Sequence, residues 1–325
     1  MGKVVDFKKP NKKPVRNNKA KVIYTNKPKN PVKSKDWMKI VLALFFIFSI
    51  YGYVKNTGIS DFNKTQEQID QEAYDEIYEA INECKTMITF VGKKADYDYI
   101  SVIYEKVVDE HPELFWVSGG ALFQTSGDVI SKSMSFSPHY RYSKDEIPKM
   151  KKTFDKEIKI WLKGISDKQS DYEKALAIHD RIVQNVVYDE EVYQRSKNNE
   201  DFYDDAYNAY GCLVTKRAVC EGYSRAYQML LQESGVETGV ISGEATDSQG
   251  ETGGHAWNYI KLDDGYYLVD VTWDDPLGNN GIDIRHDYFC LNNAQMGINH
   301  TPGDIAKVPK CDGVKFNIKT HGRKL

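Results

Sequence analysis

The chain has 325 residues, of which 41% are hydrophobic and 28% are charged, and its formal net charge is −3. This length is sufficient for a sizeable core and predicts two globular units. The five cysteines are too few, and odd in number, for a disulfide framework, and no two have the CxxC spacing of a metal site. At least one thiol therefore stays free, which invites a chemical explanation.

The N-terminal segment is strongly basic. Its first 39 residues carry thirteen Lys and Arg against two Asp, a net charge of +11 that leaves −14 for the remainder. Because this segment is poor in apolar residues and rich in Lys, Asn and Pro, residues 1–36 are predicted to form a disordered cytoplasmic tail. A nucleic-acid-binding tail is the less favoured alternative, and no nucleic-acid partner is expected.

Residues 40–54 read IVLALFFIFSIYGYV and contain no charge. This run is short of the roughly 17–25 residues that span a bilayer, but Trp37 and Met38 extend it if Lys39 reaches the headgroups. Aromatic side chains at both ends are typical of a membrane interface. We therefore predict an uncleaved single-pass anchor over residues 37–54, with the C-terminal body exported, rather than a buried core helix or a cleaved signal peptide.

Residues 55–67 are predicted to form a polar linker, followed by a small α+β unit over residues 68–165. Apolar residues recur at helical spacing in three segments of this unit, and short apolar or alternating runs occur in four others. The helices are expected at residues 68–84, 99–108 and 144–165. The strands are expected at residues 87–91, 114–117, 119–124 and 129–137.

The second predicted unit spans residues 166–325 and follows an α+β plan. Ser170 and Glu173 form the two halves of a capping box at its first helix. His179 lies on the apolar face of this helix, where a hydrogen-bonded core histidine is expected rather than a ligand. Strands are expected at residues 239–243, 255–262, 266–273 and 286–291. His286 begins the last of these strands and is expected to be structural.

The stretch AVCEGYSRAYQML, residues 218–230, places Cys220 where a loop becomes a helix. One apolar stripe follows at helical spacing: Tyr223, Ala226, Tyr227, Leu230 and Leu231. Cys220 lies on the same inward face, in a first turn whose unpaired N–H groups and helix dipole favour a thiolate. Taken alone, a small buried cysteine is the simpler interpretation.

A cysteine nucleophile needs a base, and the base needs an acceptor that fixes its tautomer. His255 in GGHAWN and Asp270 in VDVTWDDP are the candidates. If Leu262–Gly265 form a four-residue loop, Trp257 pairs with Asp270. His255 is then the diagonal cross-strand neighbour of Asp270, with about 7–8 Å between the two backbones. A two-residue Asp-Gly turn would move Asp270 further along the strand. The hairpin therefore permits the contact without requiring it.

The segments AVCEGYSRA and GHAWNYIKLDDGYYLVDVTWDDP, with the spacing between them, resemble the core of the transglutaminase-like superfamily over residues 170–292. The resemblance implies a papain-like α+β fold. It makes Cys220 the nucleophile, His255 the general base and acid, and Asp270 the group that orients His255. HPELFW, residues 111–116, is also similar to the region that precedes this core in exported bacterial members.

The implied chemistry is acyl transfer or hydrolysis through a thioester on Cys220, with no metal or cofactor. Together with the anchor, it predicts a protein or peptidoglycan-peptide substrate at the cell envelope. The family contains cross-linkers, peptidases and deamidases, so the second half of the reaction stays open. A catalytically inactive binding or scaffold protein of the cell surface is the alternative.

Three aromatic residues near the proposed catalytic residues are candidates for lining a substrate groove: Trp257, Tyr223 and Trp273. Packing in the core is the simpler interpretation of each. A regulatory disulfide between Cys212 and Cys220 is a further, less favoured hypothesis.

The backbone N–H of Cys220 is the expected oxyanion donor, and the family usually adds a side-chain donor upstream. The sequence does not assign that side chain. Gln184, Tyr188 and Tyr210 are the candidates.

Overall fold

The computed structural model describes residues 64–126, 132–197, 204–275 and 284–317. The predicted tail and the anchor at residues 37–54 lie outside these ranges. Within the described ranges, no helix is both long enough and apolar enough to cross a membrane. The anchor therefore stays a prediction.

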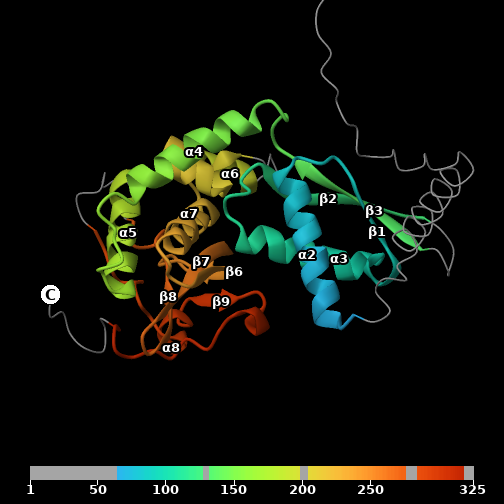
Figure 1. Ribbon diagram of the computed structural model, residues 1–325. Helices are drawn as coiled ribbons and strands as arrows, with labels where there is room; N and C mark the ends of the chain where they lie inside the picture. Colours follow the sequence, from blue (N-terminus) through green and yellow to red (C-terminus); the bar gives the residue numbers. More distant parts are fainter. Residues whose placement is uncertain (1–63, 127–131, 198–203, 276–283, 318–325) are drawn as a thin grey trace, which may run out of the picture. The chain divides into compact units, whose positions relative to one another are not determined.

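The N-terminal part of the described chain combines α-helices with a three-stranded antiparallel sheet (Figure 1). Its elements are α2 (Gln66–Asn82), β1 (Ile88–Val91), α3 (Tyr97–Glu110), β2 (Val117–Ser126), β3 (Ser133–Tyr140) and α4 (Ile147–Trp161). The strand order is β1-β3-β2. α2 begins two residues before its predicted start because the side chains of Thr65 and Gln68 accept hydrogen bonds from each other's backbone N–H groups.

The apolar run at residues 114–117 does not form the predicted strand. Leu114 to Trp116 lie in turns and are buried, and β2 begins only at Val117. The indole N–H of Trp116 donates to the carbonyl of Ile81 at 3.4 Å, and the Phe115 ring lies 4.6 Å from Tyr210. The run is apolar because it fills the core, and periodicity alone cannot distinguish this from a short strand. Between residues 114 and 137 the described chain therefore has two strands, β2 and β3, where three were expected.

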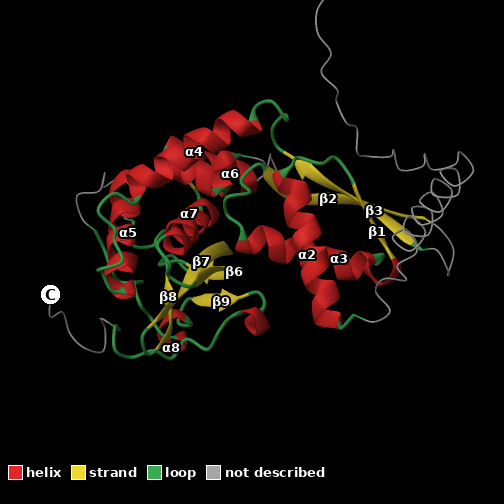
Figure 2. Cartoon of the chain, viewed as in Figure 1, coloured by secondary structure: helices red, strands yellow, loops and turns green. Residues whose placement is uncertain are grey.

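The remaining described chain packs helices on a four-stranded antiparallel sheet (Figure 2). Its helices are α5 (Asp171–Asn185), α6 (Glu190–Lys197), α7 (Cys220–Glu233) and α8 (Asn293–Met296). Its strands are β4 (Val187–Tyr188), β5 (Arg217–Ala218), β6 (Thr238–Thr246), β7 (Thr252–Leu262), β8 (Gly265–Val269) and β9 (His300–Pro302). The order β8-β7-β6-β9 places β7 and β6 at the centre, where α7 packs. The predicted capping box of Ser170 and Glu173 is present at the start of α5.

The β7–β8 hairpin has the register on which contact between His255 and Asp270 depends. Leu262 pairs with Gly265 across a two-residue turn. Lys261 therefore pairs with Tyr266, as expected if Leu262–Gly265 form the loop. A turn made by Asp264 and Gly265 would instead have shifted Asp270 further from His255. β8 ends at Val269, so Asp270 occupies the first position beyond the strand.

The strand predicted at residues 286–291 is absent. The segment forms turns, and Leu291 alone makes a bridge, to Leu268 of β8. Cys290 is fully buried and has a φ of 56°, a left-handed conformation that interrupts extended pairing. The apolar pattern therefore reflects a buried turn, and His286 lies in a loop.

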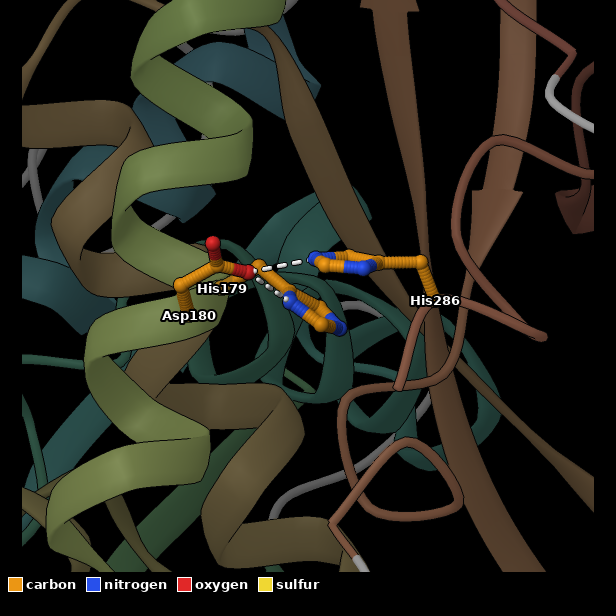
Figure 3. Close-up of side chains that lie close together, drawn as sticks. All are labelled: His179, Asp180 and His286. Atoms are coloured by element: carbon orange, nitrogen blue, oxygen red, sulfur yellow. Dashed lines mark hydrogen bonds and ion pairs between the residues drawn. The ribbon is translucent and has the colours of Figure 1, made fainter. Parts of the chain in front are cut away.

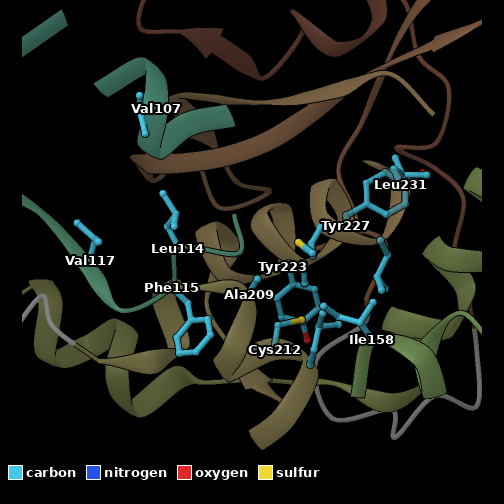
Figure 4. Packing of buried hydrophobic residues seen from close by; sticks show 14 of the residues in the cluster. Val107, Leu114, Phe115, Val117, Ile158, Ala209, Cys212, Tyr223, Tyr227 and Leu231 are labelled. Carbon is cyan, nitrogen blue, oxygen red and sulfur yellow. The ribbon is translucent and has the colours of Figure 1, made fainter. Parts of the chain in front are cut away.

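One buried apolar cluster contains residues from both predicted units (Figure 4). At the end of α4, the Trp161 indole donates to the Leu213 carbonyl at 2.8 Å. At the end of α3, the Asp109 carboxylate accepts from the Arg225 guanidinium of α7 at 2.8 Å. The two segments therefore share a core, while the domain boundary at residue 165 stays a prediction.

Candidate active site

Cys220 is the first residue of α7 and is half-buried, at a helix end whose N–H groups have no intrahelical partners. The predicted inward stripe is fully buried: Tyr223, Ala226, Tyr227, Leu230 and Leu231. Figure 4 shows three of these side chains in the buried cluster, those of Tyr223, Tyr227 and Leu231. Gly222 is required in this first turn because a Cβ there would lie 2.2 Å from the carbonyl oxygen of Ala206. The same carbonyl accepts from the Val219 N–H at 2.9 Å. The Cys-x-Gly motif thus fixes the helix start against the preceding turn.

A short parallel pairing places Tyr188 beside the start of α7. Tyr188 of β4 is opposite Ala218 of β5, two residues before Cys220. The next residue, Asp189, donates its N–H to the Ala218 carbonyl at 2.9 Å. Burial, and then the negative charge of Cys220, raise the pKa of Tyr188 well above its ordinary value. Strands of two residues leave no periodic pattern, so the sequence could not predict this proximity.

Among the three predicted side-chain donors, Tyr188 is the one that the fold places beside the start of α7, within electrostatic reach of Cys220. Gln184 is exposed on α5, and Tyr210 packs among aromatic rings. Tyr207, which the sequence did not single out, also lies within electrostatic reach of Cys220. Burial raises the pKa of Tyr207. A hydrogen bond with Ser196 lowers it, and the negative charge of Cys220 raises it again.

His255 and Asp270 are in direct contact, and Cys220 is close enough to act on the imidazole. His255 Nε2 is 2.7 Å from Asp270 Oδ2, and the negative charge of Cys220 also acts on the imidazole. Burial alone would lower the pKa of His255, but Asp270 and Cys220 together raise it to about 10. The ring is therefore stabilised as an imidazolium between two acidic groups.

Asp270 is fully buried and has hydrogen-bond partners at both oxygens. Oδ1 accepts from the backbone N–H groups of Thr272 at 3.0 Å and Trp273 at 3.1 Å. Oδ2 contacts His255 and also His300, whose Nε2 lies 3.0 Å away. Burial raises the pKa of Asp270, but the two imidazoles hold it well below its usual range. The carboxylate is thus charged and fixed in orientation.

The sequence pattern did not predict His300, whose side chain is fully buried. His300 of β9 is opposite Ala245 of β6, and His255 of β7 is opposite Gly243 of the same strand. Positions 243 and 245 face the same side of the sheet, so the two rings approach each other beside Gly243, with centroids 5.4 Å apart. No local pattern in GINHTP indicates this contact, because it depends on the strand order β7-β6-β9.

The three predicted groove residues lie in different surroundings. Tyr223 is fully buried in the core, and Trp257 is buried with its ring 4.9 Å from His300. Neither ring is available to line a groove, so both residues pack in the core, which was the simpler interpretation of each. Trp273 is partly exposed, and its ring lies 5.4 Å from His255. Trp273 alone of the three combines exposed surface with contact to the site.

The other four cysteines lie where burial raises the pKa of the thiol: Cys84, Cys212, Cys290 and Cys311. Their thiols are therefore disfavoured as thiolates at neutral pH. All five cysteines are free. The disulfide that the sequence left open between Cys212 and Cys220 is not formed.

A cavity of about 170 Å³ lies beside the start of α7. One side is lined by Tyr207 and by Glu221, the residue that follows Cys220. The other side is lined by residues of the N-terminal part, among them Tyr104 and Arg141. Both parts of the described chain therefore line a cavity beside the residue that follows Cys220.

Two groups in the described ranges have ligand atoms close enough together to hold a metal ion: His255, Asp270 and His300, and His179, Asp180 and His286. In the first group, Asp270 is hydrogen-bonded to both histidines, as described above. In the second, His179 is hydrogen-bonded at both ring nitrogens, as expected of a core histidine, with Nε2 3.1 Å from Asp274 and Nδ1 3.0 Å from Asp180. Burial lowers the pKa of His179, but the two carboxylates raise it to about 9.

Comparison with known proteins identifies the family that the central part of this chain matches. Residues 159–271 match the model of the transglutaminase-like superfamily, and this part of the chain is a transglutaminase-like domain with the mixed α and β, papain-like fold that the motifs predicted. Mouse kyphoscoliosis peptidase is 27% identical over 120 residues, which are 35% of this chain and 17% of that protein. The chain thus spans a small part of this relative.

Two solved structures show weaker likeness. One, described as a TGase, has 15% identity and a TM-score of 0.32, over 46% of this chain and 43% of its own. The other is an arylamine N-acetyltransferase from Bacillus cereus described as having a Cys-His-Glu catalytic triad. It has 17% identity and a TM-score of 0.30, over 38% of this chain and 50% of its own. At TM-scores this low, neither similarity supports a statement about the chemistry of this chain.

Proposed function

We propose that the protein is a cysteine-dependent acyltransferase or hydrolase that acts on protein or peptide amides through a thioester. The observation that supports this most directly is the contact of His255 with the buried carboxylate of Asp270, together with the electrostatic effect of Cys220 on the His255 ring. Cys220 is half-buried at a helix start, and His255 Nε2 lies 2.7 Å from a buried carboxylate oxygen. This is the arrangement that an activated thiol needs.

In the proposed first step, the Cys220 thiolate attacks the carbonyl carbon of a carboxamide or peptide bond. The C–N bond then breaks, and the leaving ammonia or amine takes the proton that His255 holds. In the second step, water or an amine attacks the thioester and gives its proton to His255. The C–S bond breaks and the thiolate returns. Asp270 stays ionised throughout and keeps the imidazole oriented.

The negative charge that develops on the carbonyl oxygen requires hydrogen-bond donors. The backbone N–H of Cys220 is free of an intrahelical partner, since Cys220 is the first helical residue. We assign the second donor to the Tyr188 hydroxyl, because the β4–β5 pairing places Tyr188 opposite Ala218, two residues before Cys220. Tyr188 would then bind the oxyanion from the β4 side.

The proposed location is the cell envelope, with residues 37–54 as a single-pass anchor and the enzymatic body outside. This proposal rests on the uncharged stretch at 40–54 and on the basic segment before it. It makes surface proteins or peptidoglycan peptides the proposed substrates. The inactive scaffold is the competing outcome that the following experiment tests.

The test is the rate at which iodoacetamide alkylates Cys220 in the purified full-length protein at pH 6, read by peptide mass spectrometry. We expect alkylation of Cys220 much faster than of a free cysteine, whereas the four other cysteines serve as internal controls. The His255→Ala variant should lose the fast reaction while keeping its folded circular dichroism spectrum. Alkylation no faster than that of free cysteine in the parent protein would favour the scaffold.

A second measurement distinguishes the two enzymatic outcomes. A glutamine-containing peptide is incubated with the protein and a labelled primary amine, and the products are separated by mass. Incorporation of the amine indicates transamidation, and release of ammonia or of a shorter peptide indicates hydrolysis. Cys220→Ala is the matched control for both products.

A further inference from the structure

A second group of histidine and carboxylate side chains lies between α5 and the loop that contains His286. Figure 3 shows both histidine rings directed at one oxygen of Asp180. That oxygen, Oδ1, is 3.0 Å from His179 Nδ1 and 2.7 Å from His286 Nε2. The ring centroids of the two histidines are 5.2 Å apart. We propose that His179, Asp180 and His286 form a binding site for one divalent transition-metal ion such as Zn²⁺.

The first argument is the orientation of His179. Its Nε2 lies 3.1 Å from Oδ2 of Asp274, and both side chains are fully buried. An Nε2–H that donates to this carboxylate leaves Nδ1, which faces Asp180, to carry either a second proton or, once that proton is displaced, a metal ion. Two lone-pair atoms at this distance need a positive species between them, either a proton or a metal ion. A histidine that ligates a metal through one nitrogen and donates from the other to a carboxylate is the usual arrangement in metal sites.

The second argument is the chemistry and size of the ligand set. Two imidazole nitrogens and one carboxylate oxygen, all within 4.8 Å of one another, suit Zn²⁺ and its neighbours rather than Ca²⁺ or Mg²⁺. Tetrahedral bonds of about 2.0–2.2 Å place ligand atoms roughly 3.3 Å apart. The carboxylate oxygen, which is 3.0 and 2.7 Å from the two nitrogens, would therefore move away from them by a few tenths of an ångström.

The third argument is access. The side chains of Asp180 and His286 are 29% and 21% exposed, while His179 is fixed in the core. The two exposed ligands can adjust their positions, and solvent can supply a fourth ligand. The site therefore combines one rigid ligand with two adjustable ones.

A metal ion here would act on structure rather than on the proposed chemistry. It would join α5 to the loop at 284–291, which lie far apart in the sequence. Asp274, which contacts His179, accepts from the Tyr288 N–H at 3.0 Å and lies in the turn that follows Asp270. Metal binding would thus stabilise the segment that carries Asp270.

The experiment titrates Zn²⁺, and separately Co²⁺, into chelator-treated full-length protein at pH 8. All proteins carry Cys220→Ser, so that the thiolate beside His255 does not bind the metal. We expect one equivalent to bind with a dissociation constant below about 10 µM, a visible Co²⁺ absorption of low coordination number, and a rise in the unfolding midpoint with Zn²⁺ concentration. Asp180→Asn and His286→Ala should each weaken binding at least tenfold.

His111→Ala is the matched control, because His111 also contacts a carboxylate, that of Glu113 at 2.7 Å, at a similar exposure of 25%. It should bind Zn²⁺ like the parent. Because His286 lies in a loop, its replacement is expected to leave the fold intact. The circular dichroism spectrum and the unfolding midpoint, both measured without metal, establish that each variant is folded. No binding by the parent, or equal binding by the parent and both ligand variants, would overturn the site and leave a proton as the species between His179 and Asp180. Neither result depends on the proposed enzymatic function.

Discussion

His255 and His300 contact the same oxygen of Asp270, at 2.7 and 3.0 Å, although they come from strands that are not neighbours in the sheet. The other oxygen, Oδ1, accepts hydrogen bonds from the backbone N–H groups of Thr272 and Trp273. Four hydrogen-bond partners therefore fix the orientation of the Asp270 carboxylate. Because Asp270 in turn holds His255, the position of the proposed base depends on a histidine that does not contact the nucleophile.

Replacement of His300 should slow the reaction of Cys220 without unfolding the protein. A hydrogen bond to a buried charge is worth about 1.5–3 kcal/mol, so we expect His300→Phe to lower the alkylation rate of Cys220 at pH 6 by about 10- to 100-fold. His300→Gln keeps an N–H donor and should lose less. Equal rates in the parent and His300→Phe, with both folded by circular dichroism, would remove His300 from the positioning of Asp270.

The Tyr188 hydroxyl should matter for turnover of an amide but not for alkylation. Alkylation by iodoacetamide forms no oxyanion, whereas attack on an amide does, so Tyr188→Phe should lower amide turnover by about 10²- to 10³-fold at an unchanged alkylation rate. Tyr210→Phe is the control, because Tyr210 packs against Phe115 at 4.6 Å and was a candidate of equal rank in the sequence. A parallel loss of both rates in Tyr188→Phe would indicate a disturbed thiol and not a lost oxyanion donor.

Gly222→Ala should destabilise the start of α7. The added Cβ would lie 2.2 Å from the Ala206 carbonyl oxygen, so the helix start and the preceding turn must separate. We expect the free energy of unfolding in urea to fall by about 1–3 kcal/mol or more. Gly120→Ala is the control, since its nearest contact would be Ser118 Oγ at 3.9 Å, and it should change stability little.

The ion pair of His255 predicts a pH dependence of stability. The pKa of His255 is raised in the folded protein from 6.5 to about 10, so its stabilising contribution is complete below pH 6.5 and is lost as the pH rises toward 10. The stability advantage of the parent over His255→Gln, measured by urea unfolding, should therefore shrink between pH 6.5 and pH 10. A constant or growing difference over that range would contradict the raised pKa.

The local features of the site were readable from the sequence because each depends on residues close together in the chain. The stripe that begins at Tyr223 places Cys220 at the inward side of a helix start. The spacing of the β7–β8 hairpin permits contact between His255 and Asp270, and the capping box at Ser170 marks the start of α5. Helical periodicity, strand alternation and turn length determine these features, and all three act over a few residues.

The same local patterns misassigned the buried turns. The apolar runs at 114–117 and 286–291 are indistinguishable from short strands by composition, since burial and not pairing makes them apolar. Only the packed core shows that Trp116 donates to Ile81 of α2 and that Cys290 adopts a left-handed conformation.

By itself, the sequence determined the family of the core and the residues that carry its motif, because short-range periodicity and spacing specify a helix start and a hairpin. The tertiary structure alone decided which distant side chains complete the site. Strand order brings His300 to Asp270, a two-residue parallel pairing brings Tyr188 to Cys220, and a loop brings His286 to α5. Such contacts depend on how the whole chain buries its apolar surface, and no local pattern encodes them.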